Sequence, residues 1–310
     1  MKKISFTIGI PTVNPMYLRF AIESALNQKY DNYNVVILNN ASDSVSKKKI
    51  KSITESFISE KISYFENTDQ LPMVSNWNKL LSYADNNYFL LLCDDDTIEK
   101  DLLAEIYKLI LKYPNALIFK SRIKEIGKNG EIISIGESST EVETDIDFIW
   151  HRTVANRAIN VSEFIVKTDA LKNIGGFTDM YAGWGSDILT WFKLATLSHH
   201  VISTSMPLAN HRVSEINAGL NSSVNLRLKE LKIYTERLKI IISKLIPTDE
   251  YQKILLEDII NNMPKHSFDN KMVLLRLRSK TLRMLSIAVL LMREKEYKVP
   301  LKIKLKLIIC

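Results

Sequence analysis

The chain has 310 residues, 46% hydrophobic and 25% charged, as expected for a globular protein with a substantial core. Its net charge of +7 is uneven: residues 271–310 hold eleven Lys and Arg against two Glu, so residues 1–270 carry about −2. The basic character therefore belongs to the C-terminal segment. Cys93 and Cys310 offer neither a disulfide framework nor zinc-ligand spacing, which suits a reducing compartment.

Apolar runs and helical periodicities alternate along the first part of the chain, which predicts a mostly parallel α/β sheet with helices on both faces. Pro11 cuts the first apolar run short, so we expect no signal peptide. We predict strands at 4–10, 34–38, 62–66, 88–93, 116–119, 132–135, 159–166 and 201–203. We predict helices at 17–28, 46–59, 74–84, 98–111, 169–173 and 187–197.

Beyond residue 224 the periodicity is helical, with breaks at Pro247 and Pro264. We place a boundary at Gly219–Ser223, which divides an α/β domain (1–220) from a basic, mostly helical extension (221–310). The longest apolar run of the extension, residues 284–292, is too short to span a bilayer.

Three carboxylates follow the most apolar strand: Tyr88–Cys93 runs directly into Asp94, Asp95 and Asp96. Ligand sites of open α/β sheets lie at the carboxyl ends of strands. If extended backbone continues, Asp94 and Asp96 point one way and Asp95 the other. Adjacent carboxylates repel one another, and a hard cation such as Mg²⁺ or Mn²⁺ would offset this repulsion. The alternative is an acidic turn that caps the helix predicted at 98–111.

The other strand ends are polar, and no glycine-rich phosphate loop or dinucleotide fingerprint is present. The first strand ends in Pro11-Thr12-Val13-Asn14 and the second in Asn39-Asn40-Ala41-Ser42-Asp43. Nucleotide contacts would gather at these positions in such a sheet. The second loop can also cap the helix that follows it.

These motifs, with others in the same order, resemble a family-two inverting glycosyltransferase with the GT-A fold. The resemblance covers roughly residues 4–215. The further motifs that carry it are Ala21–Tyr30, Asn76-Trp77-Asn78, Gly175-Gly176-Phe177, Gly183-Trp184-Gly185-Ser186-Asp187 and His211-Arg212.

The resemblance implies transfer from a nucleotide-diphosphate sugar, with a UDP-sugar as our first choice, to an acceptor hydroxyl. Asp96 matches the metal-binding carboxylate, and His211 matches a position that completes metal or diphosphate binding. Asp187 matches the general base; its alternative is a helix cap. The resemblance places the donor against Pro11, Thr12, Asn14, Asn39, Asn40, Asp43, Asn78, Asp94, Asp95 and Arg212.

Several readings stay open from the sequence. Asn39-Asn40 stands where many family members have a carboxylate that contacts the base, which leaves the nucleotide base uncertain. Trp184 is either a platform for the acceptor or a core residue, and we expect Trp77 in the core. A nucleotidyltransferase would need a glycine-rich basic loop that Pro11–Pro15 lacks. A catalytically inactive sugar-nucleotide-binding scaffold is disfavoured by Asp94, Asp96 and Asp187.

The extension alternates basic and apolar residues, notably around Arg276–Arg283 and Leu301–Leu307. Such a segment suits an anionic membrane surface. The alternative is a helical extension that packs on its own domain or in a homo-oligomer. No nucleic-acid-binding motif is found. We therefore expect a cytoplasmic enzyme, peripheral on the inner face of the plasma membrane, that extends a surface polysaccharide or lipid-linked oligosaccharide.

Overall fold

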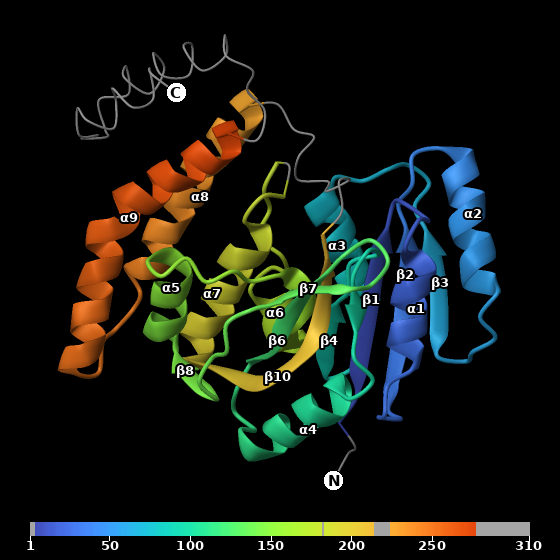
Figure 1. Cartoon of the computed structure of the whole chain (residues 1–310), viewed down its shortest axis with the longest axis horizontal. Helices are drawn as coiled ribbons and strands as arrows, with labels where there is room; N and C mark the ends of the chain where they lie inside the picture. Colours follow the sequence, from blue (N-terminus) through green and yellow to red (C-terminus); the bar gives the residue numbers. More distant parts are fainter. Residues whose placement is uncertain (1–3, 182, 214–223, 277–310) are drawn as a thin grey trace.

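The computed structural model describes residues 4–181, 183–213 and 224–276. It has a mixed, mostly parallel sheet with helices on both faces (Figure 1). Neighbouring strands β3, β2, β1 and β4 are parallel, whereas β9 runs antiparallel to both β4 and β6. Along the sheet the strands are β3 (Ile62–Glu66), β2 (Tyr33–Asn39), β1 (Phe6–Thr12), β4 (Tyr88–Leu91), β9 (Phe164–Lys167), β6 (Ile118–Ile126), β10 (His200–Arg212) and β5 (Thr97–Ile98). Beside this path, β7 (Ile132–Ile135) pairs with β6 and β8 (Val142–Thr144) with β10.

Each face of the sheet has its own apolar core, because the central strands are buried on both sides. Ile8, Val35 and Leu90 pack under α1 (Leu18–Leu26), α2 (Ser44–Glu55) and α4 (Leu102–Lys112). The opposite face includes Val36 and Phe89. The helices that cover it are α3 (Met73–Ser82), α5 (Asp145–Thr153), α6 (Thr168–Asn173), α7 (Ser186–Ser198), α8 (Val224–Ile242) and α9 (Glu250–Arg276).

Most predicted elements are present, and β3 and β7 have the predicted bounds. The predicted strand at 159–166 is instead a short 3₁₀ turn, η1 (Val161–Glu163), followed by β9. The prediction missed β8 and α5. It also predicted β10 as three residues, whereas the strand extends to Arg212. Trp77 lies in the core against Phe177, as expected.

The described part of the extension packs on the α/β domain. Leu231, Tyr234 and Leu238 of α8 and Ile259 of α9 belong to the same apolar core as α7. The indole of Trp150 on α5 donates a hydrogen bond to Asp258 of α9. The predicted boundary at Gly219–Ser223 and the basic segment beyond Arg276 lie outside the described residues. Within the described ranges, no helix is long and apolar enough to cross a membrane.

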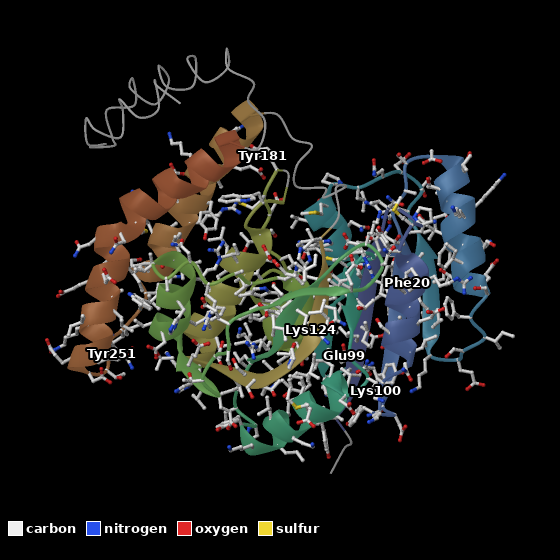
Figure 2. All side chains as sticks on the ribbon, in the orientation of Figure 1. Phe20, Glu99, Lys100, Lys124, Tyr181 and Tyr251 are labelled. Carbon is white, nitrogen blue, oxygen red and sulfur yellow. The ribbon has the colours of Figure 1, made fainter. Side chains whose placement is uncertain are left out.

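Polar contacts join β6 and β10 to the residue that follows the edge strand β5. Figure 2 shows Lys124 of β6 beside Glu99, which directly follows β5, and the two form an ion pair. Asn210 of β10 donates to the same Glu99 carboxylate at 3.1 Å. These bonds fix the end of β10, which carries His211 and Arg212.

Candidate active site

The carboxyl ends of β1 and β4 lie side by side because these strands are parallel neighbours. The backbone amides of Val13 and Asn14 donate to Asp94 Oδ2 at 3.1 and 3.3 Å. Burial raises the pKa of Asp94, although a hydrogen bond from Thr12 and these amides oppose the rise. Asp94 therefore fixes the loop that follows β1, at the edge where donor contacts were predicted.

Asp96 is the most tightly held carboxylate of the triplet and is 1% exposed. Ser162 of η1 donates to its Oδ2 at 2.7 Å. The Arg212 amide donates to its Oδ1 at 3.0 Å, and His211 Nδ1 lies 3.1 Å from the same oxygen. The structure thus brings together Asp96 and His211, the two residues predicted to bind metal.

Asp95 turns toward Asp96 rather than away from it. A carboxylate oxygen of each, together with Cys93 Sγ, lie within 4.8 Å of one another. Burial, and then the charges of Asp96 and Asp94, raise the pKa of Asp95 to about 7. The predicted alternation of the triplet is wrong, because β4 ends at Leu91 and the chain turns at these residues.

The alternative of a helix-capping triplet is also not observed. Helix α4 begins at Leu102, its N-cap residue is Asp101, and no side chain caps it. The acidic triplet therefore lies before the helix and is held by the loop after β1, by η1 and by β10 instead.

Arg212 is buried and connects three segments of the site. Its Nε donates to the Asp95 carbonyl at 2.9 Å, and its Nη1 donates to the carbonyls of Gly127 and Lys128. The guanidinium lies 4.5 Å from the ring centroid of Tyr17. Arg212 thus supports the turn of the triplet, and its contact with phosphate oxygens stays a prediction.

Asn39 ends β2 and Asn40 follows it, and both side chains form hydrogen bonds within the protein. The Asn39 side-chain amide donates to the Tyr64 hydroxyl at 2.9 Å, and its oxygen accepts from the Ala41 amide. Asn40 pairs with the Leu71 backbone through both its oxygen and its nitrogen. Both side chains order this loop, and their contact with a base stays a prediction.

Asp43 and Asn78 have clear structural contacts. Asp43 accepts a hydrogen bond from the Ser46 amide and caps α2, as the sequence allowed. Asn78 binds both the amide and the carbonyl of Phe177. This pairing fixes the loop before Asp187 to α3. Pro11 lies within β1 opposite Leu38. A donor contact for any of these residues stays a prediction.

Asp187 lies in the first turn of α7, which follows Gly185 in the left-handed region (φ 75°). A Cβ at Gly185 would lie 2.7 Å from the Tyr234 ring, so the turn and α8 fit closely only with glycine. Burial raises the pKa of Asp187, against the Ile188 amide and the positive charge of Arg152. A carboxylate with a raised pKa is suited to accept a proton.

Trp184, the possible acceptor platform, is half-buried and packs on Tyr234 with ring centroids 5.1 Å apart. Burial raises the pKa of Tyr234 to about 12, and the charge of Asp187 contributes to the rise. Trp184, Tyr234 and Asp187 therefore form one cluster where the turn after Gly183 meets α8.

The short turn η1 connects the acidic triplet to Asp187. Ser162 binds Asp96, and its neighbour Glu163 has a pKa that is raised by burial and, in part, by the charge of Asp187. Asn160 caps η1 through its oxygen and directs its amide nitrogen to His211 Nδ1 at 2.8 Å. The sequence analysis missed Ser162 and Asn160, although Asn160-x-x-Glu163 has the spacing of a capping box.

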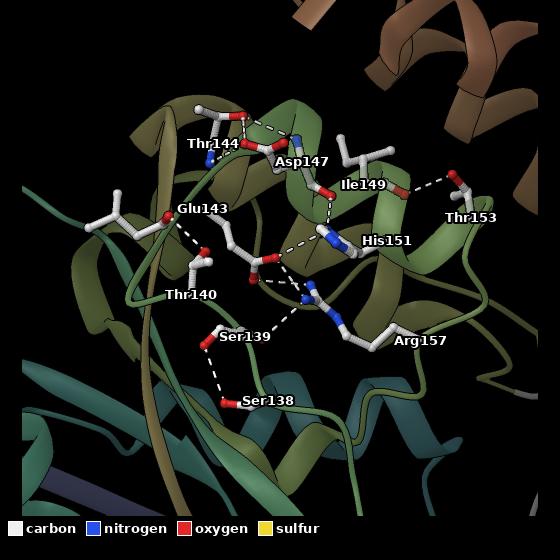
Figure 3. Close-up of polar contacts among 11 residues, drawn as sticks. Ser138, Ser139, Thr140, Glu143, Thr144, Asp147, Ile149, His151, Thr153 and Arg157 are labelled. Atoms are coloured by element: carbon white, nitrogen blue, oxygen red, sulfur yellow. Dashed lines mark hydrogen bonds and ion pairs between the residues drawn. The ribbon is translucent and has the colours of Figure 1, made fainter. Parts of the chain in front are cut away.

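A buried ion pair anchors the segment that leads into η1. Figure 3 shows Arg157 directed at Glu143, with Nη1–Oε1 and Nη2–Oε2 distances of 2.7 and 3.1 Å. His151 Nδ1 lies 3.2 Å from the same carboxylate. This pair joins β8 to the loop after α5 and so helps to position Asn160 and Ser162.

The donor atoms around Asp96 fit a divalent cation. Two carboxylates converge in a buried setting and Asp95 has a raised pKa, which indicates negative charge without full compensation. His211 lies beside them. Carboxylate oxygens suit Mg²⁺ or Mn²⁺, and an imidazole ligand would favour a transition-metal ion such as Mn²⁺ of the two.

Comparison with known proteins agrees with this architecture. Residues 7–167 match the family described as Glycosyl transferase family 2. The chain belongs to this family and has its GT-A fold.

Among relatives, the chain is 30% identical over 108 residues to "Glycosyltransferase GlyA" of Streptococcus pneumoniae serotype 4. The match covers 34% of this chain and 15% of that protein, so the chain spans only a small part of this relative's length.

Two solved structures share the fold at low identity. S. aureus TarS 1–349 in complex with UDP-GlcNAc has 16% identity and a TM-score of 0.62 over 83% of this chain and 72% of that chain. The mannosyltransferase PcManGT of Pyrobaculum calidifontis, in complex with GDP-Man and Mn²⁺, has 16% identity and a TM-score of 0.59 over 99% and 86%.

Proposed function

We propose that this chain is an inverting glycosyltransferase that moves a sugar from a nucleotide-diphosphate donor to an acceptor hydroxyl, with Asp187 as the general base. The observation that carries this proposal is the buried acidic group after β4, where carboxylate oxygens of Asp95 and Asp96 lie within 4.8 Å of one another and His211 Nδ1 lies 3.1 Å from Asp96. This group would hold the leaving diphosphate through a cation, while Asp187 would activate the acceptor. Solved structures of the same fold are complexes with UDP-GlcNAc and with GDP-Man, which supports a nucleotide sugar as the donor, with uracil as the first base to test.

The residues of the proposed site fall into a donor side and an acceptor side. On the donor side, Asp94 orders the loop after β1, and Asp95, Asp96 and His211 would hold Mn²⁺ or Mg²⁺. A divalent cation in that place neutralises charge on the diphosphate. On the acceptor side, Asp187 accepts the hydroxyl proton while the acceptor oxygen attacks the anomeric carbon from the face opposite the diphosphate. The bond to the nucleoside diphosphate breaks as the new bond forms, so the anomeric centre is inverted.

Full-length protein should be tested with a panel of UDP- and GDP-sugars and saccharide or lipid-linked acceptors, with Mn²⁺, Mg²⁺ or EDTA. We expect one donor to give a glycosylated product and free nucleoside diphosphate. NMR should show that the anomeric configuration of the product is inverted. Addition of EDTA should abolish product formation. Asp96→Asn is the matched inactive control. A retained anomeric configuration, or undiminished transfer in EDTA, contradicts the proposed mechanism.

We also propose that the basic C-terminal segment binds an anionic membrane surface, where a lipid-linked acceptor would lie. Each Lys or Arg near such a surface contributes about 1 kcal/mol, so reversing Arg278, Lys280 and Arg283 to Glu should weaken binding by roughly 100-fold or more. The control reverses Lys48, Lys49 and Lys51 of α2. Co-sedimentation with phosphatidylserine vesicles measures the effect, and equal binding by both variants contradicts the proposal.

A further inference from the structure

Cys93 is placed beside the acidic triplet by two bonds from its backbone. Its amide donates to Ser162 Oγ at 3.2 Å, while the Ser162 hydroxyl donates to Asp96. The Asp96 amide in turn donates to the Cys93 carbonyl at 3.1 Å, closing a tight turn. The turn brings the Cys93 sulfur within 4.8 Å of a carboxylate oxygen of Asp95 and one of Asp96.

This arrangement differs from an all-oxygen site in one donor atom. A first-row ion lies about 2.3 Å from a thiolate sulfur and about 2.0–2.2 Å from a carboxylate oxygen. Two ligands of one ion are therefore at most about 4.5 Å apart, a separation that small side-chain rotations can produce here. Thiolate is a soft ligand that favours Co²⁺, Zn²⁺ and Cd²⁺, whereas Mg²⁺ favours oxygen.

We propose that Cys93 Sγ is a ligand of the cation held by Asp95 and Asp96, and that it gives this site a preference for thiophilic ions over Mg²⁺. The proposal rests on the metal site of the proposed function. Binding replaces the sulfur–hydrogen bond with a sulfur–metal bond and releases the proton to solvent, with no change of oxidation state. Cys93 is partly buried against the apolar core that α7 and α8 cover, which limits competition from water for the sulfur.

The proposal predicts a spectroscopic signature that needs no catalytic assay. Cys93 and Cys310 are the cysteines of the sequence, so Cys310→Ser leaves Cys93 as the single thiol. Titration of the full-length Cys310→Ser variant with Co²⁺ or Cd²⁺ should produce a thiolate-to-metal charge-transfer band in the ultraviolet. The same titration of Cys93→Ser should produce none, with at least about tenfold weaker binding of Cd²⁺ and unchanged binding of Mg²⁺.

Electron paramagnetic resonance, which detects bound Mn²⁺, distinguishes failure of this proposal from failure of the proposed function. Bound Mn²⁺ without a charge-transfer band in Cys310→Ser overturns the role of Cys93 and leaves the metal site of the proposed function intact. No bound ion of any kind overturns both. A band in Cys93→Ser with none in Cys310→Ser assigns the sulfur to Cys310 and also overturns the proposal. Because the decisive variant is Cys310→Ser, the test does not depend on whether Cys93→Ser folds.

Discussion

Asp96 and Asp187 are both carboxylates of the candidate site, but their surroundings differ. Both oxygens of Asp96 accept hydrogen bonds, from Ser162 and from the Arg212 amide, and its side chain is fixed from two directions. Asp187 lies at a helix start, where burial raises its pKa against the Ile188 amide and Arg152. The difference indicates that Asp96 is held as a ligand of fixed geometry, whereas Asp187 is prepared to take up a proton.

Removing the charge of Asp187 tests this contrast most strongly. Asp187→Asn should lower kcat by about 10²–10⁴-fold, since an amide cannot accept the acceptor proton. Nucleotide affinity should stay within about twofold by calorimetry, because the donor side is untouched. Asp169→Asn changes an exposed first-turn aspartate of α6 and is the matched control. Equal loss of nucleotide binding and turnover in Asp187→Asn would assign this residue to the donor instead.

The buried Glu143–Arg157 pair supports both carboxylates through the segment that leads into η1. Glu143→Gln leaves Arg157 charged and buried, which should lower the free energy of unfolding by about 3–5 kcal/mol. Denaturant melts measure this loss. Glu141→Gln removes an exposed partner of Lys112 and should change stability little. Equal stability of the two variants would show that the buried pair does not anchor this segment.

The sequence anticipated the parts of the site that local patterns determine. Apolar runs located the strand before the acidic triplet, and the order of motifs indicated the fold family. Long-range pairing determined the rest. Pro207 and the polar residues Asn210 to Arg212 suggest a loop, yet pairing with β6 extends β10 through them. Ser162 carries no local signal, because its contact with Asp96 spans 66 residues.

Two other features were predicted wrongly or missed: the direction of the Asp95 side chain and helix α5. Strand periodicity predicted opposite directions for Asp95 and Asp96, but the strand ends at Leu91 and a turn brings them together. Helix α5 was missed although Thr144 and Asp147 form a capping box that the sequence displays. Its buried positions include the polar residues Asp145 and Thr153, so its apolar stripe is less distinct than that of α4, whose buried positions are all Leu or Ile.

Removing a hydrogen bond to Asp96, rather than Asp96 itself, tests whether this carboxylate is held as a metal ligand of fixed geometry. Ser162→Ala deletes the hydroxyl that donates to Asp96 Oδ2 and accepts from the Cys93 amide. We expect Mn²⁺ affinity to fall by about 10–100-fold, as is usual when a residue that orients a metal ligand is lost. Turnover at saturating Mn²⁺ should recover most of its value. Calorimetry with Mn²⁺ measures the loss, and Ser138→Ala, on an exposed loop, is the control.

The pH dependence of turnover tests the surroundings of Asp187. The base must be deprotonated, so activity falls as the pH drops through its pKa, which burial holds above the ordinary aspartate range. Arg152 acts in the opposite direction and favours the ionised carboxylate. Arg152→Gln should therefore raise the pKa of Asp187 further and move the acid limb of the kcat/KM profile to higher pH.

Arg152→Lys keeps the charge and should return the acid limb toward its original position, while Arg19→Gln, in an exposed pair with Glu23, should leave it unchanged. A merely structural role for Arg152 would lower activity at every pH without moving the limb. An acid limb that stays in place in Arg152→Gln would mean that the titrating base is a different group. In that case the contrast between a fixed ligand and a proton acceptor would no longer apply to Asp187.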